Sequence, residues 1–431
     1  MPRTTADPDK IMETANPKTP GPKTADGTRP RVHLDFLDGL RGLAAAYVVC
    51  FHFLALGATG LPRWAAYAVS WANFGHSAVN VFIVLSGFSL MLPVARSEDK
   101  HLRGGTRHYL FRRAWRILPP YYAALALSLL ALLTLPQRMT ALHEHLGTGQ
   151  SPDFSTGSLL SHLAVLHNLS PDWSGRINMA LWSVATEWQI YFLFPLLLLP
   201  VWRRFGGAAA VAAGFTAGLL PLVINRYDLS VACFWYIGLF ALGMTGAVSY
   251  ARSLWPQEGD PARRAFPSNM KLLGLTVLLM LCYLAVLKIL PAHSQARVGY
   301  LRFYIAETLK DGITGGLTVC LILYCARGVS LRREGARAPR VLLLLESPAA
   351  RALGLFSYSL YLTHCIVLQK AESVTAALHF SPLNSLSFRA FVGIPVALGF
   401  AYLFHKVAEK PFMTPFQKQS ENVLKTPLHS A

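Results

Sequence analysis

Blocks of about 20 consecutive apolar residues recur along the chain and constrain its fold more than any other feature. One block, LWSVATEWQIYFLFPLLLLPVW, occupies residues 181–202. A helix of roughly 20 apolar residues is long enough to cross a bilayer core about 30 Å thick. Only 14% of the 431 residues are charged, whereas soluble domains carry roughly a quarter. We therefore expect an all-α fold, a polytopic bundle of transmembrane helices.

The apolar blocks and the polar stretches beside them predict how the chain is organised. Residues 34–412 form the transmembrane domain, and residues 1–33 and 413–431 form two polar cytoplasmic tails. The first tail is rich in Pro, Thr and Lys and lacks the apolar core of a cleavable signal peptide, so we expect it to be disordered. Within the domain we expect about ten spans, near residues 34–57, 74–94, 114–135, 181–202, 207–226, 231–250, 271–290, 306–327, 350–372 and 388–409.

The basic residues are sorted by connection, and this sorting predicts the orientation of the chain. Cytoplasmic loops of membrane proteins carry an excess of Lys and Arg, so we expect both termini on the cytoplasmic side of the cell (inner) membrane. The same sorting explains the net charge of +18 without a basic face for nucleic acid. The basic connections hold Arg96, Lys100, Arg103, Arg107, Arg112 and Arg113, then Arg203 and Arg204, then Arg252, Arg263, Arg264 and Lys271, then Arg332, Arg333, Arg337 and Arg340.

The six cysteines all fall inside predicted spans. Their spacings match no zinc-binding pattern, so we interpret them as packing residues. We expect no metal site and no permanently bound cofactor.

Three ionisable residues interrupt the first predicted span, LDGLRGLAAAYVVCFHF (37–53): Asp38, Arg41 and His52. A helix turns about 100° per residue, so His52 lies about 20° past three full turns from Arg41 and about 40° short of four turns from Asp38. All three therefore share one stripe. The stripe should face the protein interior, because a charged group facing lipid is costly.

Two interpretations of this stripe stay open. In the first, Asp38 and Arg41 pair with each other near the cytoplasmic end, and His52 is a buried histidine that hydrogen-bonds a neighbouring helix. In the second, the stripe is functional, because histidine titrates close to neutral pH and suits general acid–base chemistry.

The first span also resembles the opening motif of the acyltransferase 3 family, in which an Arg is followed by ten residues and a His. Arg41 and His52 stand in that relation. Further phrases are similar to the family's motifs and follow in the same order, over roughly residues 34–412. They are VNVFIVLSGFSL (79–90), RRAWRILPPYY (112–122), LWSVATEWQIYFLFPLLL (181–198), LGLFSYSLYLTHCIVL (353–368) and HKVAEKPF (405–412).

Two positions depart from the family's pattern. Asn80 stands where the second span usually has an acid, and Trp188 replaces the second Glu of the pair in the fourth span. Glu187, Gln189 and Tyr191 are retained. If either missing acid orients a catalytic group or the substrate, the detailed mechanism or the acceptor class differs in this chain.

The resemblance implies a membrane enzyme that moves an acyl group, acetyl in the simplest case, from acyl-CoA to a hydroxyl of a glycan or small molecule. A hydroxyl is a weak nucleophile until a base removes its proton. We expect His52 to be that base or a transient acyl carrier, and Glu187 to orient or charge it as in an acid–His pair. The alternative for Glu187 is a hydrogen bond to another helix.

Arginine is suited to the phosphates of CoA, because its planar fork matches phosphate oxygens. We expect Arg113 and Arg116 to bind the donor's phosphates, with Arg41 deeper along the path; the alternative is that they only determine topology. The other candidates are residues whose polar side chains fall within the matched motifs, and for the last two we favour a packing role: Asp38, Asn80, Ser86, Gln189, Tyr191, Tyr361 and His364.

Two other classes of protein stay open. A transporter or flippase for a polar solute would also need ionisable groups inside the membrane, but the sequence shows no repeated halves of the kind that many transporters have. A catalytically silent scaffold is harder to reconcile with the Arg41–His52 stripe. The acceptor stays open among cell-wall glycan, lipopolysaccharide sugar, exported polysaccharide and glycosylated small molecules.

Overall fold

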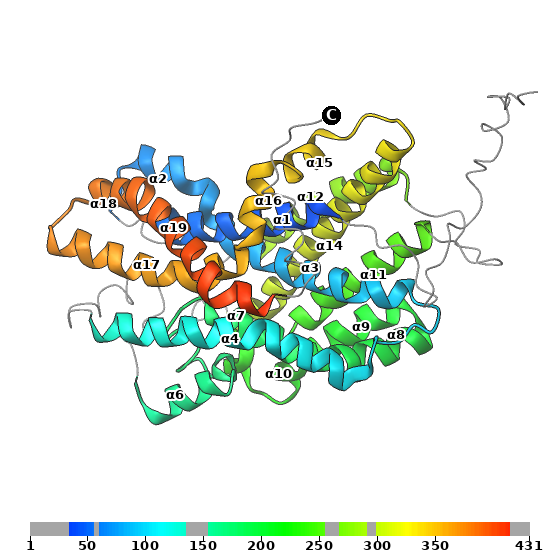
Figure 1. Ribbon diagram of the computed structural model, residues 1–431, viewed down its shortest axis with the longest axis horizontal. Coiled ribbons are helices and arrows are strands. Elements are labelled where there is room, and N and C mark those ends of the chain that lie inside the picture. Colours follow the sequence, from blue (N-terminus) through cyan, green and yellow to red (C-terminus); the bar gives the residue numbers. More distant parts are fainter. Residues whose placement is uncertain (1–33, 56–59, 135–153, 255–266, 291–298, 414–431) are drawn as a thin grey trace, which may run out of the picture.

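A computed structural model describes residues 34–55, 60–134, 154–254, 267–290 and 299–413. Within these ranges every regular element is a helix, which confirms the all-α prediction. The predicted tails, 1–33 and 413–431, lie outside the described residues apart from Met413. Figure 1 shows long helices lying beside one another, with α1 (Asp35–Cys50) in the middle of the bundle.

Eight helical segments in the described ranges are long and apolar enough to cross a membrane, so the chain is built as a multi-pass membrane protein. Their elements are α1 with η2 (Phe51–Ala55); α2 (Arg63–Val69), η3 (Ser70–Phe74) and α3 (Gly75–Arg96); α4 (Gly105–Leu133); α7 (Leu181–Leu193), η6 (Phe194–Leu198) and α8 (Leu199–Phe205); η7 (Tyr227–Ala232) and α11 (Tyr236–Leu254); α12 (Asn269–Ile289); α14 (Tyr300–Arg333); and α18 (Pro382–Phe388), η9 (Arg389–Gly393), α19 (Ile394–Phe404), η10 (His405–Glu409) and η11 (Lys410–Phe412).

Two of the ten predicted spans take a different form. The segment expected at 350–372 is broken into α16 (Pro348–Leu355) and α17 (Ser357–Ala377), which meet at 72°. The segment expected at 207–226 consists of α9 (Gly207–Gly218), which has 12 residues, and the single turn α10 (Leu220–Val223). At 1.5 Å per residue α9 is about 18 Å long, less than a bilayer core of about 30 Å. The count of ten spans therefore stays a prediction.

Shorter helices connect the spans. α6 (Thr156–Leu163) and η5 (His167–Leu169) precede α7, and α15 (Arg340–Leu345) precedes α16. With 8 and 3 residues, α6 and η5 are each too short to cross a bilayer.

Glycines let α3 and α11 approach until their backbones touch. A Cβ atom added to Gly87 would lie 2.0 Å from the Phe240 carbonyl oxygen, and one added to Gly243 would lie 2.1 Å from the Val84 carbonyl oxygen. Small residues at such positions are typical of helix pairs in membranes, where association relies on close packing. The contact is reciprocal, so both glycines fix the spacing of this pair.

The same device holds α1 against the segment that precedes α17. A Cβ on Gly42 would lie 2.4 Å from the backbone nitrogen of Gly354, and a Cβ on Gly354 would lie 2.1 Å from the Asp38 carbonyl oxygen. Gly39 is packed as closely on the Leu345 carbonyl of α15. The start of α1, which carries the ionisable stripe, is therefore enclosed by protein on this side.

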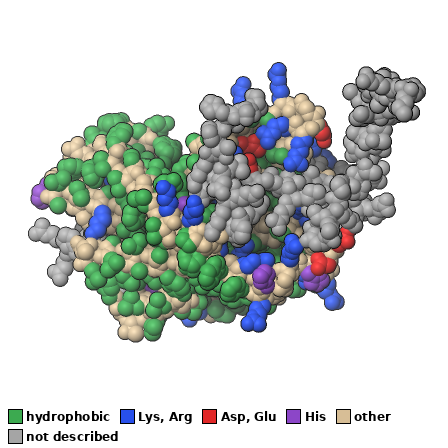
Figure 2. All heavy atoms as spheres, viewed as in Figure 1, with side chains coloured by type: hydrophobic (Ala, Val, Ile, Leu, Met, Phe, Trp, Pro, Cys, Tyr) green, Lys and Arg blue, Asp and Glu red, His purple; other side chains and the backbone are tan. Residues whose placement is uncertain are grey.

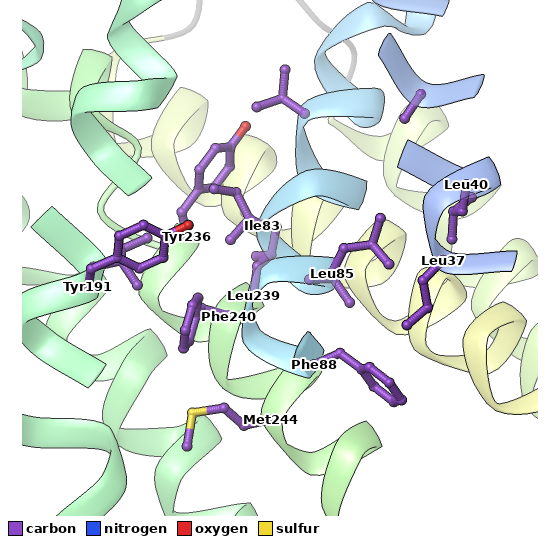
Figure 3. Packing of buried hydrophobic residues seen from close by; sticks show 14 of the residues in the cluster. Leu37, Leu40, Ile83, Leu85, Phe88, Tyr191, Tyr236, Leu239, Phe240 and Met244 are labelled. Carbon is purple, nitrogen blue, oxygen red and sulfur yellow. The ribbon is translucent and has the colours of Figure 1, made fainter. Parts of the chain in front are cut away.

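Apolar side chains of α1, α3 and α11 fill the space between these helices. In Figure 3 the α3 side chains lie between those of α1 and those of α11. All of these side chains are buried, and they include Leu37, Leu40, Ile83, Leu85, Phe88, Leu239, Phe240 and Met244.

The basic connections meet at one end of the bundle. Arg203 after α8 donates to the Lys100 carbonyl oxygen at 2.8 Å, and Arg351 of α16 pairs with Asp35 at the start of α1 at 3.3 Å. In Figure 2, Lys and Arg side chains gather over the right of the visible face, while the left is mostly hydrophobic. The connections grouped by their charge therefore share a side, and the cytoplasmic assignment of that side stays a prediction.

Replacing Gly87 by Ala should destabilise the protein by about 1–3 kcal/mol, the usual cost of overpacking. The reason is that α3 and α11 must separate to admit the new methyl group. Thermal unfolding of the protein in detergent measures the effect. Gly274→Ala in α12 is the matched control, because in the described part of the chain no atom outside its own helix backbone lies within 4 Å of its added Cβ. Equal unfolding midpoints for the two variants would contradict the close-packed pair.

Candidate active site

The ionisable stripe of α1 faces the neighbouring helices. Arg41 pairs with Asp38 at 3.0 Å, the i, i+3 contact that the first interpretation anticipates. Its other terminal nitrogen, Nη2, donates to Ser89 Oγ of α3 at 2.7 Å. Asp38 and Arg41 therefore form an ion pair that is also bonded into the bundle.

His52 lies in η2, a π-helical turn that continues α1. Such turns widen a helix locally and occur frequently at functional sites. The Nδ1 atom of His52 lies 2.9 Å from Nε2 of His364 on α17, and the two ring centroids are 4.9 Å apart. His364 is fully buried, whereas His52 is partly exposed. The two histidines form a hydrogen-bonded dyad that joins two spans.

The hydrogen-bond pattern assigns the protons of this dyad when both rings are neutral. His364 Nδ1 lies 3.0 Å from the Leu360 carbonyl oxygen, which only accepts, so Nδ1 carries the proton. His364 Nε2 is then an acceptor, and His52 Nδ1–H donates to it. This leaves the lone pair of His52 on Nε2. The dyad therefore presents one unprotonated ring nitrogen with a fixed orientation.

Glu187 of α7 lies in a different group of polar side chains. Its Oε1 accepts from Ser86 of α3, and it also accepts from Tyr191 at 2.5 Å, one turn further along α7. The other oxygen, Oε2, has no hydrogen-bond partner in the part of the chain that the structure describes. Glu187 and Ser86 are partly exposed, so one carboxylate oxygen stays available to a ligand.

The structure thus gives His52 a different partner from the one expected. We expected Glu187 to orient His52, but His364 does so, and Glu187 bonds Ser86 and Tyr191. His364, for which a packing role seemed the better interpretation, is in direct contact with the ring it would position.

The two arginines at the entry to α4 differ in how they are bound. Arg116 Nη2 pairs with Glu409 at 2.5 Å, and Glu409 is fully buried. The second oxygen of Glu409 accepts from Ser359 Oγ at 2.5 Å and from His405 Nδ1 at 2.9 Å. Arg116 therefore belongs to a buried network that joins α4, α17 and η10, and this limits the donors left for phosphate.

Arg113 has a buried Nε without a hydrogen-bond partner in the described residues. It lies within electrostatic range of Tyr109 and of Tyr191, which bonds Glu187. A buried guanidinium donor with no acceptor is costly unless a ligand supplies one. Arg113 is therefore better suited than Arg116 to bind an anionic group.

The remaining sequence candidates each bond a residue far along the chain. Asn80 Nδ2 donates to Asp311 Oδ1 of α14 at 2.7 Å, and Tyr361 Oη lies 2.6 Å from Ser183 Oγ of α7. Gln189 donates to Asn168 Oδ1 of η5 at 2.7 Å. These three residues connect spans to one another or to the η5 segment and do not contact His52.

Sequence reasoning missed Asp311, His76 and Glu409. Asp311 stands inside the predicted span 306–327, where an ionisable residue is itself a signal of function. His76 lies at the start of a predicted span and four residues before Asn80, on the same face of a helix. Glu409 was noted only as part of the closing motif, and a lone motif letter does not reveal its buried partner Arg116.

Two groups of side chains bring three potential metal ligands within 4.8 Å of one another in the described residues. One group contains His52, His364 and Cys365, and the other contains His76, Glu307 and Asp311. Hydrogen bonds already join the ligand atoms of both groups. The expectation that the protein holds no metal stays a prediction.

Comparison with known proteins connects this geometry to a family. A family model described as an acyltransferase domain matches residues 34–406. The chain belongs to the acyltransferase 3 family. The expectation drawn from the motif order is therefore confirmed.

Relatives of this chain carry names from acyl-transfer chemistry. One relative is SACOL0978 of Staphylococcus aureus, provisionally named an O-acetyltransferase. The two sequences are 22% identical over 395 residues, and the aligned region covers 87% of this chain and 56% of the relative. A second relative is YrhL of Bacillus subtilis, provisionally named a peptidoglycan O-acetyltransferase. It is 27% identical over 175 residues, and the aligned region covers 40% of this chain and 25% of the relative. A third relative is the peptidoglycan O-acetyltransferase OatA of Listeria monocytogenes. It is 25% identical over 173 residues, and the aligned region covers 39% of this chain and 25% of the relative.

The chain spans only 25% to 56% of the length of these relatives. No solved structure matches it significantly.

Glu409→Gln should lower the free energy of unfolding by about 3–5 kcal/mol, because it leaves the Arg116 charge buried without its partner. Combining Arg116→Met with Glu409→Gln removes both charges and should recover most of the loss. Denaturation of the purified protein in detergent measures both effects. If Arg116 serves only to bind the donor, Glu409→Gln will unfold like the wild type.

Proposed function

We propose that this chain is a membrane-embedded O-acyltransferase that moves an acyl group from cytoplasmic acyl-CoA to a hydroxyl of a glycan or glycosylated small molecule. Acetyl-CoA is the simplest donor consistent with relatives named for O-acetyl transfer. The observation that carries the proposal is the unprotonated Nε2 of His52, fixed by His364 through Nδ1. His52 lies within residues 34–406, which the family model matches.

This nitrogen can take part in acyl transfer in two ways. As a general base, it removes the proton of the acceptor hydroxyl while the oxygen attacks the thioester. As a nucleophile, it takes the acyl group first and passes it to the acceptor. In both cases the neighbouring ring of His364 keeps Nδ1 protonated and leaves Nε2 to react, as the acid of a triad does for its histidine.

Arg113 supports a site for the CoA phosphates. Its Nε is buried without an acceptor in the described residues, and it lies on the half of α4 that follows the basic connection 97–104. Phosphate oxygens bind guanidinium groups through charge-assisted hydrogen bonds. Arg116 contributes to the same site through Nη1, which also has no partner within the described chain.

The names of the relatives favour a glycan acceptor. YrhL and OatA are both named for peptidoglycan O-acetylation. The matched part of each is only 25% of that relative, so peptidoglycan is the first acceptor to test. The alternative of a transporter or flippase receives no support from these names.

His52→Ala should reduce acetyl transfer from acetyl-CoA to peptidoglycan fragments by at least about 10²-fold, the usual contribution of a general acid–base group. The assay uses purified full-length protein in detergent or nanodiscs, with radiolabelled acetyl-CoA. His101→Ala is the matched control, because that histidine is exposed and its ring contacts the Asp99 carbonyl oxygen in its own loop. A His52→Ala protein that transfers acetyl at the wild-type rate would contradict the proposal.

A further inference from the structure

A second hydrogen-bonded histidine lies at the start of α3. His76 Nε2 lies 3.0 Å from Asp311 Oδ2 on α14. Asp311 is buried and accepts two further bonds, from Asn80 Nδ2 and from Trp235 Nε1, each at 2.7 Å. Because an ionised carboxylate only accepts, His76 must donate through Nε2–H. Three donors, two from α3 and one from the residue before α11 (Tyr236–Leu254), therefore fix the carboxylate and, through it, the histidine.

The other nitrogen of the ring is available. Nδ1 of His76 has no hydrogen-bond partner among the described residues, and the side chain is 40% exposed, against 3% for Asp311. The Tyr236 hydroxyl lies 3.2 Å from Nε2, on the side already taken by the carboxylate. A buried acid, a histidine bonded to it and a free second nitrogen are the parts of an acid–His base.

Asn80 gives this pair its context. Asn80 occupies the position where the family pattern has an acid, and its amide donates to Asp311. In this chain the carboxylate next to position 80 therefore belongs to Asp311 of α14 and not to α3 itself. An acid at position 80 would repel Asp311, whereas the amide of Asn80 stabilises it.

The His76–Asp311 pair lies close to the turn that carries His52. A Cβ added to Gly75 would lie 2.2 Å from the ring of Phe51, so the residues next to His76 and His52 are in contact. The turn η2, which continues α1, therefore packs on the first residues of α3. His52 and His76 are also both partly exposed there.

A second path of contacts joins the two histidine pairs through α7. The ring of His76 stacks on Trp182, with centroids 6.0 Å apart and planes at 10°. The next residue, Ser183, bonds Tyr361, whose ring centroid is 5.9 Å from that of His364. The start of α7 thus touches His76 through Trp182 and is linked to His364 through Ser183 and Tyr361.

We propose that His76 Nδ1, positioned by Asp311, is the base that removes the proton of the acceptor hydroxyl, and that His52 Nε2 is the atom that carries the acyl group. This division rests on the proposed acyl transfer from acyl-CoA. His76 is then a catalytic residue, and Asp311 is a positioning residue.

The proposed reaction has two steps, acylation of His52 and transfer of the acyl group to the acceptor. In the first, His52 Nε2 attacks the thioester carbonyl carbon, a C–N bond forms, the C–S bond breaks, and CoA leaves as a thiolate that takes a proton from water. In the second, the acceptor oxygen attacks the same carbon, a C–O bond forms and the C–N bond breaks. The hydroxyl proton passes to His76 Nδ1, and the resulting imidazolium is stabilised by Asp311 until it returns the proton to water.

A bound cation is the competing explanation for the same side chains, because Glu307 also lies within 4.8 Å of this pair. Two observations favour the hydrogen-bonded pair. Glu307 is already paired with Lys310 at 2.5 Å. Both oxygens of Asp311 also accept bonds from neutral donors, Asn80 and Trp235.

The test separates the two steps in purified full-length protein. CoA release from acetyl-CoA without acceptor reports the first step, and acetyl transfer to peptidoglycan fragments reports the second. His76→Ala and Asp311→Asn should release CoA within about twofold of the wild-type burst, while transfer falls by at least about 10²-fold. Added imidazole should restore transfer to His76→Ala and not to Asp311→Asn. His101→Ala, at an exposed position, and Asp228→Asn, at a partly exposed aspartate paired with Arg226, are the matched controls.

A variant that still releases CoA from acetyl-CoA without acceptor carries out the first step and is therefore folded. Wild-type rates of transfer in both variants would overturn the assignment, and so would loss of CoA release together with transfer. Transfer that stops when divalent cations are chelated would overturn it in favour of a metal site. A wild-type protein that transfers acetyl but releases no CoA without acceptor would overturn the role given to His52. A wild-type protein inactive in both assays would instead contradict the proposed function.

Discussion

The hydrogen bond between His52 and His364 is the interaction on which the rest of the site depends. A polar side chain between transmembrane helices needs a partner inside the protein, because hydrocarbon offers none. His52 finds this partner on α17, and the Leu360 carbonyl fixes the proton of that partner in turn. The result is an imidazole with a fixed orientation, a defined tautomer and one unprotonated nitrogen. The proposed acyl transfer needs such a group to carry the acyl group to the acceptor.

Backbone contacts at glycine place the elements that carry these side chains. Gly42 and Gly354 set the distance between α1 and α16, immediately before the bend into α17. Gly87 and Gly243 do the same for α3 and α11. Because these helices touch through their backbones, a shift of one moves the polar groups of the next. The polar networks and the close packing therefore stabilise the same arrangement.

The sequence was sufficient for features that depend on one helix. Composition and apolar block length predicted an all-α membrane bundle, and helical phase placed His52 on a stripe that faces other helices. Which residue of another span would meet His52 could not be predicted. Glu187 and His364 are both polar residues of later spans, and depth in the membrane does not determine which helices are neighbours. The pairing of Asn80 with Asp311, 231 residues away, was invisible for the same reason.

The protonation state of His52 tests the central claim most directly. Solid-state nitrogen NMR of histidine-labelled protein in lipid distinguishes protonated from unprotonated ring nitrogens, and the loss of signals in His52→Gln assigns them. The account predicts that His52 carries its proton on Nδ1, that this proton is shared with His364 Nε2, and that His52 Nε2 is unprotonated. A neutral His52 with its proton on Nε2, or without coupling to His364, would contradict it.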